Sequence, residues 1–366
     1  MKRSQLTNYV SALTLGAALL GTIAKAETDA ALYTMDNAAA GNHVITFERG
    51  EDGALSLAGS FATGGAGSGA GLSSQGSLAL SHDGRWLLVC DAGSSEISVL
   101  GVSGHGLKLL DKIGSGGQMP VSLSLHHDLL YVLNAGGLVG GKDNITAFKF
   151  ENGKLTPLPH STRALSGDNT GPAEVSFARD GDVLVVTERL TSLIDTFVVG
   201  HDGRTEAHKT FPSANATPFG FDVGHKGRIF VSEAAGSASS YEVSEDGELA
   251  VITAAASTKQ AAPCWLLLSH DGRSAYTANA GSGSLSGFDV DHNGAITLIT
   301  PDGRTAVTGD GSHPVDMAQS RDGRFLYSLN NGNGTITGFG VKPDGSLIPA
   351  TVVNGIPTSA AGLAGR

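Results

Sequence analysis

The chain repeats one pattern of apolar and polar positions. An apolar strand ends at Ser-x-Asp-Gly, a strand of the type Leu-Tyr-x-x-Asn follows, and a Gly/Ser loop leads to a strand of the type Ile-x-x-Phe-x-Val. A second Asp-Gly or Asn-Gly turn then introduces a fourth strand. The copies cover residues 31–55, 81–108, 125–155, 178–204, 224–249, 269–296 and 320–347. Seven copies at a spacing of about 45–50 residues are typical of a propeller or a solenoid.

The turns within each copy decide between these two architectures. Asp-Gly and Asn-Gly favour two-residue hairpin turns, because both central residues need a positive φ. Four antiparallel strands per copy therefore predict an all-β fold, a seven-bladed β-propeller. The first copy lacks its first strand, whereas Gly355–Arg366 resembles the Pro-led first strands of other copies. We expect this C-terminal strand to complete blade one and to leave no open edge.

The first 26 residues differ from the repeats. Lys2 and Arg3 precede an apolar run that ends at Ala24-Lys25-Ala26, the pattern of a signal peptide cleaved after Ala26. A membrane anchor is the alternative, but the run is short and holds polar residues. We expect residues 1–26 to be a signal peptide and 27–366 to form a single propeller domain that is periplasmic or secreted, has no membrane span after cleavage, and is a monomer.

Composition narrows the classes of function. The 366 residues include 52 Gly and 16% charged residues, which is typical of a globular chain, and the net charge of −11 argues against nucleic-acid binding. No spacing typical of a metal site, phosphate loop or serine nucleophile occurs. We therefore predict no metal and no cofactor. The two cysteines, Cys90 and Cys264, fall in distant copies, and we expect buried free thiols.

One position can be compared in every copy, namely the last residue of the second strand. Read in chain order it is Asp36, Asp91, Asn134, Glu188, Glu233, Asn279 and Asn330. A short Asp or Asn side chain bonds its own backbone and starts a turn, which explains most of them. Glu188 and Glu233 fit that role poorly and lie in adjacent blades, so they are candidate general bases, with a solvated Glu as the alternative. Asp91 and Asn134 are candidate substrate-binding residues on the same face.

The same register places other chemistry on this face, where the loops vary in length and content. Arg189 follows Glu188 and is a candidate for balancing its charge or binding a carboxylate or oxyanion. His313 precedes Pro314 at the start of a first strand and is a candidate catalytic residue. Candidate substrate-binding residues two positions after the Pro site are Glu174, Trp265 and Asp316. For Trp265 the alternative is inter-blade packing. We assign no chemistry to His82, His127, His225 and His270, which fall at turns on the other face.

The segments AYTANAGSGSLSGF and LYSLNNGNGTITGF resemble the YVTN-type propeller repeat. Residues 31–366 are similar to the seven-bladed lactonase family, which includes 6-phosphogluconolactonases and 3-carboxy-cis,cis-muconate cyclases. The resemblance implies an active site at the channel mouth, with a Glu at the end of a second strand and His and Arg nearby. Glu188 and Arg189 match that region. The His-Pro pair that the family often places before the first strand of the same blade is here Gly171-Pro172.

Two functions follow from these observations. The first is a lactonase-like hydrolase of a sugar or carboxylic-acid lactone, in which Glu188 or Glu233 activates water and Arg189 or His313 stabilises the oxyanion. The alternative is a non-enzymatic exported propeller that binds a ligand, protein or cell-surface polymer through the same face, because propellers host many functions.

Overall fold

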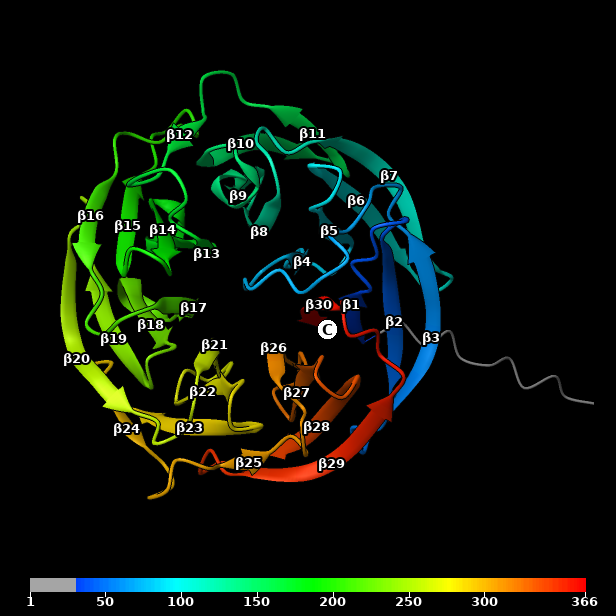
Figure 1. Cartoon of the computed structure of the whole chain (residues 1–366), viewed down its shortest axis with the longest axis vertical. Helices are drawn as coiled ribbons and strands as arrows, with labels where there is room; N and C mark the ends of the chain where they lie inside the picture. The colour runs from blue at the N-terminus through cyan, green and yellow to red at the C-terminus, as the bar shows by residue number, and fades with distance from the viewer. Residues whose placement is uncertain (1–30) are drawn as a thin grey trace, which may run out of the picture.

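The computed structural model describes residues 31–366, so the predicted signal peptide lies outside the described residues. Seven small antiparallel sheets surround a central channel in a closed ring (Figure 1). Each sheet has four strands in line, and two sheets carry one additional short strand. The predicted all-β, seven-bladed propeller is confirmed.

In six blades the strands run outward from the channel in sequence order, and in blade one the C-terminal β30 is the innermost strand. The innermost strands are β30 (Ala361–Gly365), β4 (Leu78–Leu80), β8 (Pro120–His126), β13 (Pro172–Ala178), β17 (Pro218–Val223), β21 (Pro263–Leu268) and β26 (Pro314–Gln319). The second strands are β1 (Leu32–Met35), β5 (Trp86–Asp91), β9 (Leu129–Ala135), β14 (Val183–Glu188), β18 (Arg228–Glu233), β22 (Ser274–Asn279) and β27 (Phe325–Asn330). The third strands are β2 (His43–Arg49), β6 (Glu96–Ser103), β10 (Asp143–Glu151), β15 (Leu193–Val198), β19 (Ser237–Val243), β23 (Ser284–Val290) and β28 (Thr335–Val341). The outer strands are β3 (Leu55–Ala62), β7 (Gly106–Gly114), β11 (Lys154–Pro157), β16 (Lys209–Pro212), β20 (Leu249–Ser257), β24 (Ile296–Leu298) and β29 (Leu347–Asn354), with β12 (Arg163–Ala164) and β25 (Ala306–Val307) beside β10 and β23.

The chain ends meet in blade one. β30 pairs antiparallel with β1, and Leu32 lies opposite Gly365. The predicted closure is confirmed. β30 supplies the inner strand that the N-terminal copy lacks. In Figure 1 the red C-terminal strand lies beside the blue β1.

Tyrosines of the second strands join neighbouring blades. The hydroxyl groups of Tyr131, Tyr276 and Tyr327 each donate to the carbonyl of a turn glycine in the next blade at 2.9 Å, namely Gly203, Gly345 and Gly53. These glycines have φ between +74° and +83°, a region that favours Gly. The repeated Tyr and the Asp-Gly turns are therefore two halves of one inter-blade contact.

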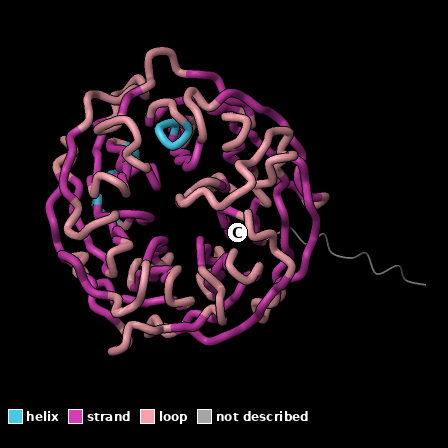
Figure 2. The backbone as a smooth tube through the Cα atoms, in the orientation of Figure 1, coloured by secondary structure: helices cyan, strands magenta, loops and turns pink. Residues whose placement is uncertain are grey.

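Besides the strands, residues 31–366 contain three 3₁₀ helices. These are η1 (Gly136–Val139), η2 (Arg179–Gly181) and η3 (His225–Gly227), and loops and strands make up most of the chain (Figure 2). In the part of the chain that the structure describes, no helix is long and apolar enough to cross a membrane. Cys90 and Cys264 are both buried and unbridged, as predicted.

Candidate functional site at the mouth of the central channel

The inner strands of five blades begin with a shared backbone turn at one mouth of the channel. The residue before the first Pro has a positive φ in each of them: Met119, Gly171, Thr217, Ala262 and His313. A non-glycine residue with positive φ is uncommon, so the repeat imposes it through the surrounding structure. His313, with φ of 47°, is exposed at this rim.

A segment between blades one and two crosses the channel below this rim, where Figure 1 shows a loop reaching the centre ahead of β4. The Gln75 side chain donates to the carbonyls of Phe221 (3.0 Å) and Leu266 (2.7 Å) and accepts from the Leu266 amide (3.0 Å). The Gln75 amide itself donates to the Ala173 carbonyl at 3.0 Å. One glutamine thus ties together the inner strands of blades four, five and six.

Two cavities lie on either side of this crossing segment. The mouth cavity, of about 260 Å³, is lined by Leu72, Ser73, Ser74, Trp265 and His313, among others. The lower chamber, of about 250 Å³, is lined by Gln75 with Glu174 and Asp316. Two predicted residues, Trp265 and His313, therefore share one cavity, and two others face a separate chamber.

Arg189 extends from the end of β14 over an aromatic pair. Its Nε donates to the Gly171 carbonyl at 3.1 Å, and its guanidinium lies 5.3 Å from the centre of the Phe219 ring. The Phe219 and Trp265 ring centres are 4.8 Å apart, and Trp265 Nε1 donates to the Ser74 carbonyl at 2.9 Å. Burial lowers the pKa of Arg189, and no ion pair between described residues involves it. A half-buried cation without an acidic partner is suited to an anionic group of a ligand.

Glu188 and Glu233 are not brought to this cavity. Each is fully buried and is hydrogen-bonded to its own set of partners. Glu188 accepts from the Ser166 amide (3.0 Å), the Ser166 hydroxyl (2.5 Å) and the Thr191 hydroxyl (2.6 Å). Glu233 accepts from the hydroxyls of Ser237 and Ser239, both at 2.6 Å. Enclosed carboxylates cannot reach a water in the mouth cavity, and Arg189 does not balance Glu188.

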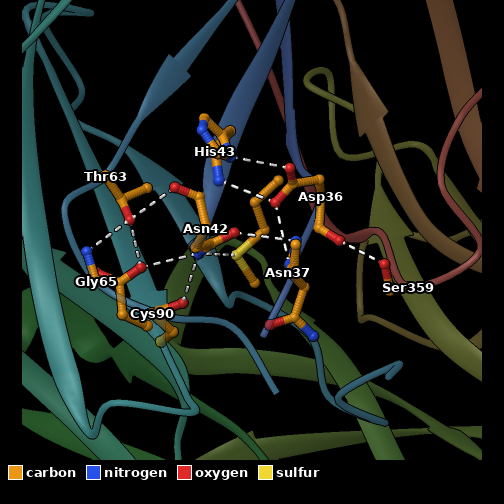
Figure 3. Close-up of polar contacts among 11 residues, drawn as sticks. Asp36, Asn37, Asn42, His43, Thr63, Gly65, Cys90 and Ser359 are labelled. Atoms are coloured by element: carbon orange, nitrogen blue, oxygen red, sulfur yellow. Dashed lines mark hydrogen bonds and ion pairs between the residues drawn. The ribbon is translucent and has the colours of Figure 1, made fainter. Parts of the chain in front are cut away.

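The same position has a structural role in the other blades. Asp91 is fully buried and accepts from the Ser98 and Thr63 hydroxyls, and Asn134 is fully buried and donates to Asn144. Figure 3 shows the counterpart in blade one, where Asp36 accepts from the backbone and imidazole of His43 while Asn42 and Thr63 reach toward blade two.

Glu174 and Asp316 bond the inner strand of the next blade. Glu174 Oε2 accepts from the Phe221 amide at 2.6 Å, and Asp316 Oδ2 accepts from the Leu363 amide at 3.0 Å. Burial raises the pKa of both groups, that of Asp316 to about 8. They face the lower chamber, on the far side of Gln75 from His313.

A further cavity opens on the opposite face. It measures about 1170 Å³ and includes His126, His225 and His270. Its arginine, Arg179, is already paired with Glu245 at 2.9 Å. Two of the histidines to which the sequence analysis assigned no chemistry therefore line a cavity. No group of described residues is arranged to hold a metal ion.

Sequence reasoning missed Gln75, Phe219 and Asp195. Gln75 lies in a Gly/Ser-rich loop without periodicity, so no pattern indicates its path. Asp195 had a signal, because all seven copies can be compared at the position after the third-strand apolar residue, where blade one carries Ile45. The others carry Ser or Thr there: Ser98, Thr146, Ser239, Ser286 and Thr337.

Comparison with known proteins identifies the family to which the chain is similar. The model of the family described as "Lactonase, 7-bladed beta-propeller" matches residues 27–166 and 229–359, which is well over half of the chain. No curated protein matches the chain.

Solved structures share the architecture at low sequence identity. A putative 6-phosphogluconolactonase from Bacteroides uniformis is 18% identical with a TM-score of 0.71, over 91% of this chain and 99% of that one. A putative 6-phosphogluconolactonase from Bacteroides fragilis is 19% identical with a TM-score of 0.69, over 93% and 98%. The periplasmic gluconolactonase of Pseudomonas aeruginosa is 18% identical with a TM-score of 0.71, over 91% and 98%. At these identities the likeness establishes the fold alone.

Proposed function

The chain belongs to the seven-bladed β-propeller lactonase family, and from this membership we propose that it is a hydrolase that opens the lactone ring of a sugar acid at the channel mouth. The observation that carries the proposal is the stack of Arg189 on Phe219 and of Phe219 against Trp265, because Trp265 lines the same cavity as His313. A cation without an acidic partner, an aromatic wall and an exposed imidazole are a suitable set for a polar anionic transition state.

The reaction needs one base and one site of positive charge. His313 accepts a proton from water as the water oxygen attacks the lactone carbonyl carbon. Arg189 stabilises the negative charge that develops on the carbonyl oxygen. The ring C–O bond then breaks, the proton passes to the leaving alkoxide, and the product is a hydroxy acid. This assignment gives the base to His313 rather than Glu188 or Glu233, because both carboxylates are enclosed.

We also propose that the protein works as a monomer on a small-molecule lactone in the periplasm or after secretion. Residues 1–26 support export by their sequence, and a periplasmic gluconolactonase is among the structural neighbours. No step of the reaction requires a cofactor.

The test is lactone opening followed by pH-stat, with the spontaneous rate subtracted. The panel contains unphosphorylated sugar lactones, 6-phosphogluconolactone and a muconolactone. We expect Arg189→Met and His313→Gln to lower kcat/KM by about 100-fold each. His270→Gln is the matched control on the opposite face and should stay within about twofold.

Each other result has a definite meaning. A larger loss in His270→Gln than in His313→Gln would move the reaction to the opposite face. No turnover of any lactone by the wild type would contradict the hydrolase and favour the non-enzymatic ligand-binding protein. The enclosure of both predicted carboxylate bases is the observation that keeps this second function in view.

A further inference from the structure

A hydroxyl group on the third strand is hydrogen-bonded to the last residue of the second strand in four blades. Ser98 donates to Asp91 and Ser239 donates to Glu233, both at 2.6 Å. Ser286 accepts from the Asn279 amide at 2.9 Å, and Thr337 accepts from the Asn330 amide at 3.0 Å. A hydroxyl fits every case because it both donates and accepts.

Blade four places Asp195 at this position. Asp195 lies opposite Val186 on β14, as Ser98 lies opposite Val89 and Ser239 opposite Val231. Its carboxyl group faces that of Glu188, and both residues are fully buried. Asp195 Oδ1 accepts from the Thr210 hydroxyl at 2.7 Å, whereas its Oδ2 is enclosed with no donor group. Two ionised carboxylates are acceptors only, so they hydrogen-bond one another only when one carries a proton.

The surroundings of the pair supply no balancing cation. Burial, and then the Glu188 charge, raise the pKa of Asp195 to about 7. β16 contributes the Thr210 hydroxyl, and the loop before β13 contributes Ser166. The cations of the adjoining elements are engaged elsewhere: Lys209 with Asp246 and Glu248, Arg163 with backbone carbonyls, and Arg189 with Gly171 and Phe219. Asp143 on β10 accepts from Thr170, and Asp168 pairs with Lys142.

The pair is connected to the channel mouth through a short segment, Ser166–Gly171. Glu188 holds its first residue through the Ser166 amide and hydroxyl. At its other end the Gly171 carbonyl accepts from both the backbone amide and the Nε of Arg189. The guanidinium therefore contacts a segment that is held at its first residue by Glu188 and at Thr170 by Asp143.

We propose that Asp195 and Glu188 share one proton and act as a latch that holds Ser166–Gly171, and with it Arg189, in place at the channel mouth. Asp195 is a positioning residue that acts through Glu188 and touches no substrate. When the shared proton leaves to solvent, two like charges remain in a buried site, Glu188 releases Ser166, and the segment opens. The consequence for turnover rests on the proposed function, whereas the latch itself does not.

The latch is tested by hydrogen exchange of the Ser166 amide, which is bonded to Glu188, and of the Thr170 amide, between pH 5 and 9, corrected for intrinsic rates. In the wild type we expect protection to fall by about tenfold per pH unit from about pH 5 to about pH 7 and to level off above it, because only in that range does opening release one proton. Asp195→Asn keeps a donor toward Glu188 at every pH and should remove this dependence. Asp195→Ser, which restores the hydroxyl found in other blades, should also remove the pH dependence. It serves as a second variant in case Asp195→Asn does not fold. Glu233→Gln changes the residue of blade five that corresponds to Glu188, and it should leave the pH dependence of the Ser166 amide unchanged.

Wild-type protection that is independent of pH, or a dependence that persists in both Asp195 variants, would overturn the latch. Lactone turnover measured on the same samples separates the two proposals. If exchange protection depends on pH but the protein opens no lactone, the latch proposal stands and the hydrolase proposal is contradicted. In an active protein, we expect KM to rise as pH increases toward about 7 and then to level off in the wild type, and to stay flat in Asp195→Asn.

Discussion

At the scale of single residues, the buried carboxylates Asp316 and Glu233 differ in their donors. Glu233 is surrounded by hydroxyl groups, whereas Asp316 accepts only from the backbone amides of Met317 (2.8 Å) and Leu363 (3.0 Å). Two amides do not offset the loss of water around the charge, so burial raises the pKa of Asp316 to about 8. Asp316 therefore enters the folded state as a neutral acid at acidic and neutral pH.

This gives Asp316 a specific effect on stability. Its pKa is higher in the folded protein than in the unfolded chain, whose reference value is 3.8. The folded state then binds more protons between these values, so its contribution is present below about pH 4 and is lost as pH rises to about 8. Asp316→Asn should cost about 1 kcal/mol at pH 5 through one lost acceptor and should unfold with a weaker pH dependence. Urea unfolding of both proteins at pH 5, 7 and 9 measures this, and parallel curves would contradict it.

At the scale of elements, the crossing segment determines the form of the mouth. Gln75 satisfies three backbone groups of two neighbouring inner strands, Phe221 and Leu266. The inner edge of a propeller strand has no further strand to pair with, so its free amides and carbonyls need such partners. Glu174 and Asp316 serve the same purpose for the next blades.

Gln75→Ala leaves those backbone groups without a side-chain partner. We expect a loss of about 1–3 kcal/mol in the free energy of unfolding, together with a changed fluorescence of Trp265, whose Nε1 bonds the adjacent Ser74. Gln118→Ala, at an exposed glutamine of another loop, should change stability by less than about 0.5 kcal/mol. Equal effects of the two substitutions would show that Gln75 is not a structural tie.

How far the sequence predicts each element follows from its local chemistry. Glu188, Glu233, Asn279 and Asn330 end their second strands as predicted, while β9 runs one residue beyond Asn134. Turn residues specify these ends locally. The side chains at the ends were harder to interpret, because whether Glu188 faces solvent or Asp195 depends on cross-strand register and on Ser166, a residue of a distant loop. The path of Gln75 depends on three other blades and has no local signal.

At the scale of the whole molecule, closure is the step that makes the seven blades one ring. β30 pairs with β1 in blade one and contacts β26 and β4 of the two neighbouring blades. Its Leu363 is buried, and the Leu363 amide is bonded to Asp316 of blade seven. The last residues of the chain therefore connect the first, second and last blades.

Truncation after Ala360 tests this connection. Removal of β30 exposes the β1 edge and the contacts of Leu363, so we expect the free energy of unfolding to fall by at least about 3 kcal/mol and the protein to associate through the free edge. A synthetic peptide of residues 356–366 should restore the wild-type midpoint, whereas a peptide with Leu363→Asp should not. The Leu363 amide that donates to Asp316 is lost with β30. The truncated protein should therefore regain the pH dependence of unfolding assigned to Asp316 only when the unsubstituted peptide is bound. A truncation that unfolds at the wild-type midpoint would mean that the ring is held by its other blade contacts and that closure is dispensable.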